Sequence, residues 1–343
     1  MSKKPLLSRA ALRARLEKFP RVRIAHLPTP LEEMPRLSAE LAGPRILIKR
    51  DDATGLAFGG NKGRHYEYEM PHVRDAGYDV LINIMDYHSN NARMTAAAAN
   101  RFGIPYVLVL RNAKGRPVQG NLLVDKLLGA ELHLLDPEES KGALDYARRL
   151  AADLEAKGRK PYLLQDHVFP TVVGMISYVG CGLELLDQLE ERGIGSVRIF
   201  GVAGRSLCGL ILAAKNLGLD WKFTGVTVTY DVDLEDYIFR NAGRIGEMLD
   251  LPATFDRSDM AVLNDYIGEG YGIPTQEVIE AIHLTARKEA VILDPNYTGT
   301  AMAALIDQVR KGKVRRDETV VFLHTGGLPA VFTFAEELAA WEG

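Results

Sequence analysis

The chain has 343 residues, of which 47% are hydrophobic and 25% are charged, and its formal net charge is -3. This length is typical of about two domains, and the composition is that of a globular protein able to bury a large core. A net charge so close to zero excludes a general positive field that would recruit nucleic acid or an anionic membrane. We therefore expect neither of them as a partner.

The chain has two cysteines, Cys181 and Cys208. They do not form a metal-binding spacing, and each lies in an apolar, helix-like stretch, so we expect two reduced, buried thiols and no metal site. No apolar run appears long enough to form a membrane-spanning helix. Together these features predict a cytoplasmic protein.

Residues 1–23 are rich in Lys and Arg and contain one acidic residue, Glu17. This composition is also found in transit peptides. Nothing else in the chain indicates export, so we favour a surface helix that keeps its basic residues in water. The apolar residues of this stretch are then expected to face the core: Leu6, Leu7, Leu12 and Leu16.

Short β-branched runs alternate with longer helical stretches through most of the chain. Residues 80–84 predict a buried strand, and residues 89–102 predict a helix that ends at Gly103. Residues 106–110 return as a strand. A strand, a helix and a second strand in this order form a βαβ unit, in which the two strands are parallel.

A second unit of this kind consists of a strand at 197–202, a helix at 207–217 and a strand at 224–229. A further strand at 319–323 runs into a His-Thr-Gly-Gly loop. This alternation predicts an α/β fold with helices on both faces of mostly parallel sheets. In such sheets, ligands bind at the carboxyl ends of the strands. The loops with unusual residues at these ends are 85–91, 203–206 and 324–327.

The segment Gly59-Gly60-Asn61-Lys62 is the first candidate for chemistry. Two glycines allow the backbone to come close to a ligand, and a buried lysine next to them would have a lowered pKa and a nucleophilic amine. On its own, such a segment is more often a turn with a solvated lysine. Its meaning depends on the neighbouring loops.

Polar residues in other loops strengthen the case for a ligand site. Ser89, Asn90 and Asn91 open a helix directly after a strand, where they either cap the helix or bind a ligand. Tyr271 lies in a glycine-flanked loop, and Tyr297 follows Asp-Pro-Asn and precedes Thr-Gly. Each tyrosine alone would more often be a packing residue.

Six segments, taken in order and spacing, resemble one family. They are FPRVRIAHLPTPLE, IKRDDATGLAFGGNKGR, HSNNARMTAAAA, GYGIPT, LDPNYTGTAM and HTGG. From about Phe19 to Leu338 the chain is similar to the D-cysteine desulfhydrases and 1-aminocyclopropane-1-carboxylate deaminases, which are pyridoxal-phosphate (PLP) enzymes of fold-type II. The resemblance implies a tryptophan synthase β-like fold, a two-domain, three-layer α/β structure with mostly parallel sheets. It places a larger PLP-binding domain at 1–63 plus 167–343 and a smaller inserted domain at 64–166.

The resemblance also implies roles for individual residues. Lys62 matches the lysine that forms a Schiff base with PLP, and Ser89 matches a catalytic serine. Tyr271 and Tyr297 match catalytic tyrosines that act as acid/base or leaving-group partners. The other residues expected to bind the cofactor are Asn61, Asn90, Gly204, Arg205, Ser206, Leu207, Thr298, Thr325 and Gly326. Those expected to contact the substrate are Ser89, Asn90, Asn91, Tyr271 and Tyr297.

The chain departs from the family where the cofactor phosphate would bind. The usual glycine-rich loop is replaced by Ala203-Gly204-Arg205-Ser206-Leu207, although a helix start that can bind a phosphate remains. The family's lysine three residues after the Schiff-base lysine is replaced by His65. We expect Arg205 to compensate for the cation lost at position 65. The alternative is that Arg205 points to solvent.

The substrate end departs as well. The family's Ser-Asn-His is Ser-Asn-Asn here, and its glycine-rich Gly-Gly-Ser-Asn-like segment is replaced around residues 165–170. Thr298 is expected to face the pyridine nitrogen. A hydroxyl is a weaker partner than a glutamate for a protonated nitrogen, which favours β-elimination over ring-opening deamination. We therefore expect a substrate that differs from those of the best-known members.

These observations predict a PLP-dependent lyase that removes a β-substituent from a small amino acid and gives a 2-oxo acid and ammonia. The expected substrate is D-cysteine or a cysteate-like compound. Deamination, β-replacement or racemisation by the same lysine remain open, and a non-catalytic binding protein of this fold is the less favoured alternative. The resemblance implies a homodimer.

Overall fold

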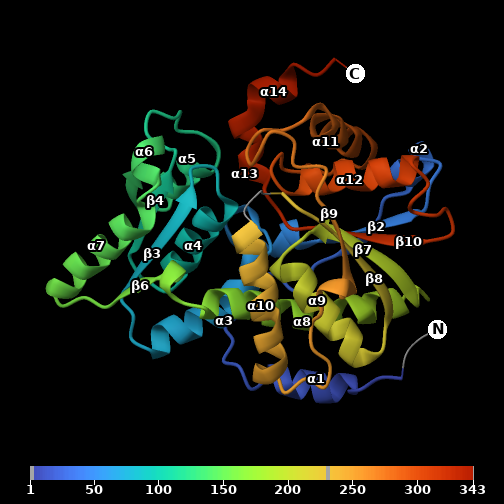
Figure 1. Ribbon diagram of the computed structural model, residues 1–343, viewed down its shortest axis with the longest axis horizontal. Coiled ribbons are helices and arrows are strands. Elements are labelled where there is room, and N and C mark those ends of the chain that lie inside the picture. Colours follow the sequence, from blue (N-terminus) through green and yellow to red (C-terminus); the bar gives the residue numbers. More distant parts are fainter. Residues whose placement is uncertain (1–3, 229–231, 343) are drawn as a thin grey trace.

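The computed structural model describes residues 4–228 and 232–342, without the side chains of residues 232–235. The chain forms two β-sheets with helices packed on their faces (Figure 1). The larger sheet is parallel except for its first pair, and its strands follow in the order β1 (Leu31–Glu33), β2 (Arg45–Arg50), β10 (Thr319–His324), β7 (Ser196–Val202), β8 (Asp220–Val226) and β9 (Met260–Leu263). The smaller sheet is fully parallel, in the order β5 (Glu131–Leu134), β4 (Tyr106–Arg111), β3 (Val80–Asp86) and β6 (Pro161–Leu163).

Helices cover both faces of the larger sheet because alternate strand residues point to opposite sides. Leu47, Val321 and Leu323 belong to one core, and Ile46 and Phe322 belong to the other. The first core is closed by α1 (Arg9–Leu16), α8 (Phe169–Glu190), α9 (Arg205–Leu217) and α10 (Val232–Met248). The second is closed by α2 (Pro35–Glu40), α11 (Gln276–Glu289), α12 (Thr298–Arg310) and α14 (Ala335–Ala339).

The smaller sheet is covered in the same way. One face packs against α3 (Lys62–Asp75), α4 (Asn90–Arg101) and α5 (Gly120–Leu127), and the other against α7 (Ala143–Ala156). Helix α3 also packs against α8 and so connects the two sheets. The remaining short helices are η1 (Asp51–Thr54), η2 (Leu56–Phe58), α6 (Pro137–Ser140), η3 (Leu164–Asp166), η4 (Arg257–Asp259), α13 (Leu328–Val331) and η5 (Phe332–Phe334).

The fold confirms the predicted α/β class with helices on both faces of mostly parallel sheets. The predicted strands at 80–84, 106–110, 197–202 and 319–323 are β3, β4, β7 and β10, each within two residues. The strand predicted at 224–229 is wrong at both ends. Strand β8 begins at Asp220, because buried Trp221 and Phe223 alternate with polar residues, and it ends at Val226. Thr229 lies outside the described residues. The division into domains at 1–63 plus 167–343 and 64–166 stays a prediction.

The amino-terminal stretch forms α1, whose Leu12 and Leu16 are buried as predicted. Leu6, in contrast, is 53% exposed and Leu7 only partly buried, because both precede the helix. Both cysteines are free and buried. The prediction about apolar runs was too strict, since α8 is long and apolar enough to cross a membrane by length and composition, but most of that helix is buried inside the protein.

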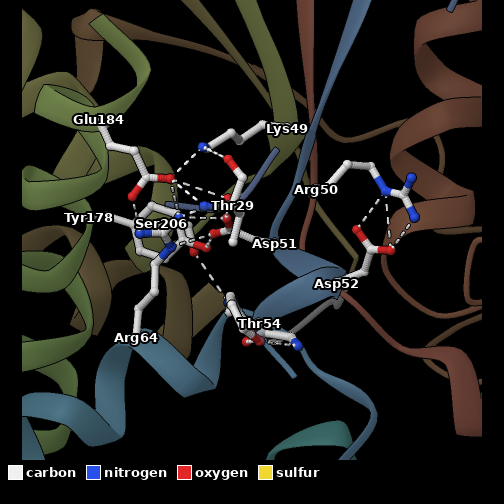
Figure 2. Close-up of polar contacts among 12 residues, drawn as sticks. Thr29, Lys49, Arg50, Asp51, Asp52, Thr54, Arg64, Tyr178, Glu184 and Ser206 are labelled. Atoms are coloured by element: carbon white, nitrogen blue, oxygen red, sulfur yellow. Dashed lines mark hydrogen bonds and ion pairs between the residues drawn. The ribbon is translucent and has the colours of Figure 1, made fainter. Parts of the chain in front are cut away.

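A buried ionic network holds the start of α3 against the larger sheet (Figure 2). Arg64 donates to both carboxylate oxygens of Asp51, at 2.8 and 2.9 Å, and to Glu184 at 2.9 Å. Lys49, on β2, donates to the backbone oxygen of Thr29 at 2.7 Å and forms an ion pair with Glu184. Burial raises the pKa of Asp51, but the Arg64 guanidinium outweighs burial, so the pKa lies below its ordinary value. The network therefore fixes α3 with its charges paired.

Candidate functional site

Strands of both sheets end around one cavity of about 720 Å³. That volume is sufficient for a cofactor together with a small substrate. Most of the predicted site residues line this cavity, namely Asn61, Lys62, Ser89, Asn90, Asn91, Gly204, Arg205, Ser206, Tyr271, Tyr297, Thr325 and Gly326. The structure thus brings together loops that are far apart in the sequence.

Lys62 is the first residue of α3, and it lines the cavity. Its Nζ atom donates a hydrogen bond to Asn61 Oδ1 at 3.2 Å, and no carboxylate among the described residues forms an ion pair with it. Burial, and secondly the charge of Arg205, lowers the pKa of Lys62 to about 7. A large fraction of such an amine is neutral at physiological pH, and a neutral amine is a nucleophile.

The two glycines before Lys62 allow a close contact between two segments of the chain. Gly59 and Gly60 have φ values of 70° and 131°, a region that favours glycine. A Cβ atom on Gly60 would lie 3.2 Å from the backbone oxygen of Thr325, and one on Gly326 would lie 2.7 Å from the Gly60 Cα atom. The expected close approach is therefore to the loop after β10, and not only to a ligand.

Arg93, on α4, is a site residue that the sequence analysis missed. Its side chain is fully buried. It donates to the backbone oxygens of Ala57 and Gly59, the latter at 3.2 Å, and to Asn121 Oδ1 at 2.9 Å. Arg93 therefore ties the loop before Lys62 to α4. Its only signal in the sequence was its place inside the HSNNARM motif.

The segment at the start of α4 both caps the helix and lines the cavity. Ser89 Oγ accepts hydrogen bonds from two backbone N–H groups of the first turn, at 3.2 and 3.4 Å. Asn90 Oδ1 accepts from Asn121 at 2.9 Å, and its own amide nitrogen donates to none of the described residues. Asn91 Oδ1 accepts from the Tyr66 hydroxyl at 3.2 Å. A free amide donor at Asn90 is thus available to a ligand.

Tyr271 and Tyr297 form a pair in the cavity wall, with their hydroxyl oxygens 2.7 Å apart. Burial raises the pKa of Tyr297 to about 12 and that of Tyr271 well above its ordinary value. Both hydroxyls therefore carry protons at neutral pH. His88, which was not predicted, stacks on Tyr271 with ring centroids 5.0 Å apart, and burial lowers its pKa to about 4. The neutral imidazole supports the tyrosine ring.

The amino-terminal end of α9 faces the cavity through Gly204, Arg205 and Ser206. The N–H group of Cys208 bonds to the Gly204 oxygen at 3.1 Å. The N–H groups before Cys208 have no acceptor within the helix, which is the usual arrangement of an anion site. The Arg205 side chain lies in the cavity wall, where it donates to the Pro170 backbone oxygen at 3.4 Å.

Leu207 and Thr298 are predicted site residues that do not line the cavity. The Leu207 side chain is fully buried in the core beside α8. Thr298 is 1% exposed, and its hydroxyl donates to Asp294 Oδ1 at 2.7 Å. Successive residues at a helix start point in different directions, so Tyr297 reaches the cavity while Thr298 faces the interior. The role of Thr298 opposite the pyridine nitrogen stays a prediction.

The wall beside the smaller sheet contains charged residues that the sequence analysis missed. Asp86 and Arg111 end the paired strands β3 and β4 in register, and Arg111 Nη2 donates to Asp86 Oδ2 at 2.9 Å. Lys141 lines the same wall and forms an ion pair with Glu138 at 2.5 Å. Only the pairing of β3 with β4 could have revealed the Asp86–Arg111 pair.

A cavity of this kind suits a cofactor that presents an aldehyde to a lysine and a phosphate to a helix start. Over residues 22–326 the chain matches the family described as pyridoxal-phosphate dependent enzyme. The chain belongs to this family of enzymes, and its cofactor is pyridoxal phosphate. The predicted family and cofactor are confirmed.

Individual relatives narrow the comparison. The chain is 36% identical over 326 residues to a D-cysteine desulfhydrase of Salmonella typhi, covering 93% of this chain and 97% of that protein. It is 35% identical over 331 residues to a Pyrococcus horikoshii protein named as a candidate 1-aminocyclopropane-1-carboxylate deaminase, covering 95% and 97%. It superposes on the crystal structure of an ACC deaminase homologue with a TM-score of 0.85 and 33% identity, covering 97% and 99%. A threonine deaminase of Solanum lycopersicum shares the fold, with a TM-score of 0.63, 18% identity and coverage of 95% and 87%.

The residues present fit the cofactor. When bound, pyridoxal phosphate supplies an aldehyde that captures an amine and a ring that accepts an electron pair from the α-carbon. Lys62 would hold the aldehyde, the start of α9 would hold the phosphate, and the free amide of Asn90 would face the ring. The position of Gly204, Arg205 and Ser206 in the cavity lining, at the start of α9, is the observation that supports the phosphate position.

Proposed function

We propose that the protein catalyses α,β-elimination from a small β-substituted amino acid, with D-cysteine as the first candidate, and releases a 2-oxo acid and ammonia. The observation that carries this proposal is a lysine of lowered pKa in the same cavity as a pair of protonated tyrosines. Elimination needs a base at the α-carbon and an acid at the leaving group. The 36% identity to a D-cysteine desulfhydrase supports the substrate.

Lys62 supplies the base. With the cofactor holding the amino group of the substrate, the Lys62 amine would be free to take the α-proton. Burial is the first cause of its lowered pKa and persists when the cofactor is bound. Ser89, Asn90 and Asn91, which line the cavity at the start of α4, hold the substrate carboxylate with their polar side chains.

The tyrosine pair supplies the acid. When the bond between the β-carbon and sulfur breaks, sulfur leaves with the electron pair and takes a proton from Tyr271 or Tyr297. The second hydroxyl, 2.7 Å away, then stabilises the resulting phenolate. Water hydrolyses the unsaturated product to the 2-oxo acid and ammonia. General acid and base groups of this kind contribute typically ~10²–10⁴-fold to the rate.

A second candidate substrate carries an acidic β-substituent, as cysteate does, and would release sulfite. The wall that contains Arg111 and Lys141 favours this candidate. Arg111 uses Nη2 to bind Asp86, and its other amino group, Nη1, donates to none of the described residues. A guanidinium with a free donor can bind a sulfonate or carboxylate.

Product analysis distinguishes these possibilities. Both enantiomers of cysteine and of cysteate are supplied to the PLP-loaded protein, and the 2-oxo acid, ammonia and released sulfide or sulfite are measured. Elimination predicts equal amounts of the three products. A substituted amino acid formed from an added thiol, inversion without ammonia, or binding without turnover would reject elimination in favour of replacement, racemisation or a binding function, respectively.

We also propose that the protein acts in the cytoplasm as a homodimer of chains with domains at 1–63 plus 167–343 and 64–166. The two free, buried cysteines are in keeping with a reducing compartment. Exposed apolar side chains on the adjoining α5, α13 and η5 segments support a dimer: Leu123, Leu127, Leu328 and Phe332. Light scattering of the purified protein measures the oligomeric state, and a monomeric mass would reject the dimer.

A further inference from the structure

Arg205 is an arginine without a counter-ion in the cavity that contains Lys62. Its one hydrogen bond to the described residues goes to the Pro170 backbone oxygen at 3.4 Å, and no carboxylate among them pairs with it. The other arginine in the wall, Arg111, is paired with Asp86. Arg205 is half-buried, and partial withdrawal of an unpaired charge from water carries a cost, so the arrangement indicates that an anion is the missing partner.

The titratable groups around Arg205 do not neutralise it. On α3, Glu69 is buried and its Oε1 atom has no hydrogen-bond partner. Burial raises the pKa of Glu69 to about 8, so most of this carboxyl is protonated at neutral pH. Burial, and then the charges of Lys62 and Arg205, hold the pKa of His65 well below its ordinary value, so His65 is neutral. The other facing groups are tyrosines of α3, α10 and α12, namely Tyr66, Tyr237 and Tyr297.

Helix α8 brings no charge to this region. A Cβ atom on Gly174 would lie 3.1 Å from His65 Cε1 and 3.2 Å from Arg205 Cδ. His65 and Arg205 therefore pack against the same point on α8, where the helix has no side chain. The Arg205 side chain therefore lies beside His65, at whose position the family resemblance implies a lysine.

A chain of hydrogen bonds connects the start of α9 to Lys62. Asn61 Nδ2 donates to Ser206 Oγ at 3.2 Å, and Lys62 Nζ donates to Asn61 Oδ1 at 3.2 Å. This path connects Lys62 to Ser206, the residue that follows Arg205 at the start of α9. Two cations in one cavity disfavour each other, and the charge of Arg205 is the second cause, after burial, of the lowered Lys62 pKa.

We propose that Arg205 couples phosphate binding to the protonation of Lys62. While no phosphate is bound, the unpaired guanidinium repels a proton from Lys62, and the amine stays ready to react with the cofactor aldehyde. Once the cofactor phosphate lies at the start of α9, the guanidinium is paired and Lys62 accepts a proton more readily. The lysine is therefore a good nucleophile during cofactor loading and a stronger base during catalysis. This inference concerns cofactor loading and does not depend on which amino acid is the substrate.

The test is a titration of Lys62 in the full chain after removal of the cofactor. Reductive methylation with ¹³C-formaldehyde labels the amine, the Lys62→Ala variant identifies its NMR signal, and the chemical shift is followed against pH. Without an added anion the pKa is expected at about 7. Inorganic phosphate is expected to raise it by roughly one unit, as for the removal of one nearby like charge.

Two variants of Arg205 make the test decisive. Arg205→Gln is expected to raise the Lys62 pKa without phosphate, to abolish the phosphate effect, and to weaken PLP retention by about 10- to 100-fold. Arg205→Lys is expected to restore all three properties toward native. Lys141→Gln is the matched control, because Lys141 lines the same cavity but is paired with Glu138, and it should leave the titration unchanged. If Lys62 titrates identically in native protein and Arg205→Gln, or if phosphate shifts both equally, the proposal is wrong.

Discussion

Lys49 is buried and Lys62 is half-buried, and the surroundings of the two lysines are opposite. Lys49 is 0% exposed, and its amine has three acceptors, from Thr29, Glu184 and Gln188. Figure 2 shows the first two. Lys62 has a single acceptor at 3.2 Å and no carboxylate partner among the described residues. The Lys49 amine therefore has a hydrogen-bond acceptor for each of its three N–H groups. The Lys62 amine retains N–H groups that can interact with a ligand.

The same difference extends to the regions around the two lysines. Around Lys49, Arg64 is paired with two carboxylates. Around Lys62, Arg205 has no counter-ion, and one polar atom each of His65 and Glu69 has no partner among the described residues. A buried polar network whose members are paired specifies one rigid structure, whereas one with unmet groups is costly until a ligand arrives. The two regions therefore separate stability from function.

Separate replacements of Lys49 and Lys62 should have the largest effects, one on stability and the other on activity. Lys62→Ala is expected to lower turnover by about 10⁴-fold and to leave the melting temperature close to native, because the side chain has few bonds to lose. Lys49→Met is the matched variant and should lower the melting temperature. A Lys62→Ala protein that still turns over substrate at a tenth of the native rate would reject the catalytic role.

Arg64→Met is expected to cost about 3–5 kcal/mol in the free energy of unfolding, since it leaves Asp51 and Glu184 buried without their partner. Urea denaturation of the PLP-loaded protein measures this change. A loss of unfolding free energy below about 1 kcal/mol, the value of an exposed ion pair, would contradict the stabilising role of the network around Lys49.

Tyr297→Phe is expected to lower kcat for D-cysteine by about 100-fold, because the leaving sulfur loses its proton donor. The loss should be much smaller for β-chloroalanine, since chloride leaves without a proton. Steady-state kinetics with both substrates measure the difference. Equal losses would indicate that Tyr297 only shapes the cavity.

Glu69→Gln should change the pH dependence of stability. The pKa of Glu69 is raised from 4.5 to about 8, so between these values the folded chain holds a proton that the unfolded chain lacks. This group therefore lowers the free energy of unfolding as pH rises from 4.5 to 8. The free energy of unfolding of Glu69→Gln, taken relative to that of native protein, should therefore rise by about 1–3 kcal/mol from pH 5 to pH 9. Urea denaturation at the two pH values checks this, and an equal difference at both would contradict it.

Arg111→Gln should have the smallest effect and should be confined to acidic substrates. It is expected to raise KM for cysteate by about tenfold, the value of one exposed charge-assisted contact, and to leave KM for D-cysteine unchanged. An equal change for both substrates would indicate that the Asp86–Arg111 pair only supports the wall.

The sequence was sufficient to predict the residues that lie at strand ends or in short motifs. Lys62, Ser89 and Asn90 were found in this way, and so was the tyrosine pair. The alternation of strands and helices placed their loops near the carboxyl ends of strands, and in the structure strands of both sheets end around the cavity. Local patterns were adequate here because each residue is positioned by the element directly before or after it.

Contacts between remote segments could not be predicted. Arg93 donates to the backbone oxygens of Ala57 and Gly59, in the loop before Lys62. Any residue can supply a backbone acceptor, so the sequence gives no sign of these bonds. The Asp86–Arg111 pair depends on the register of two strands. Thr298 was placed opposite the pyridine nitrogen by the family resemblance, and no local pattern indicated the hydrogen bond from its hydroxyl to Asp294. Side-chain direction at a helix start depends on backbone geometry that the sequence does not display.

Strand β10 is the last strand of the described chain, but it lies between β2 and β7 in the larger sheet. The loop after it contributes Thr325 and Gly326 to the cavity and contacts the loop that precedes Lys62. During synthesis on the ribosome, β2 and the Lys62 loop therefore lack this neighbouring strand until β10 has emerged. Contacts between such distant segments slow folding. We expect the nascent chain to bind its cofactor only after β10 has emerged, because the cavity wall is incomplete before then.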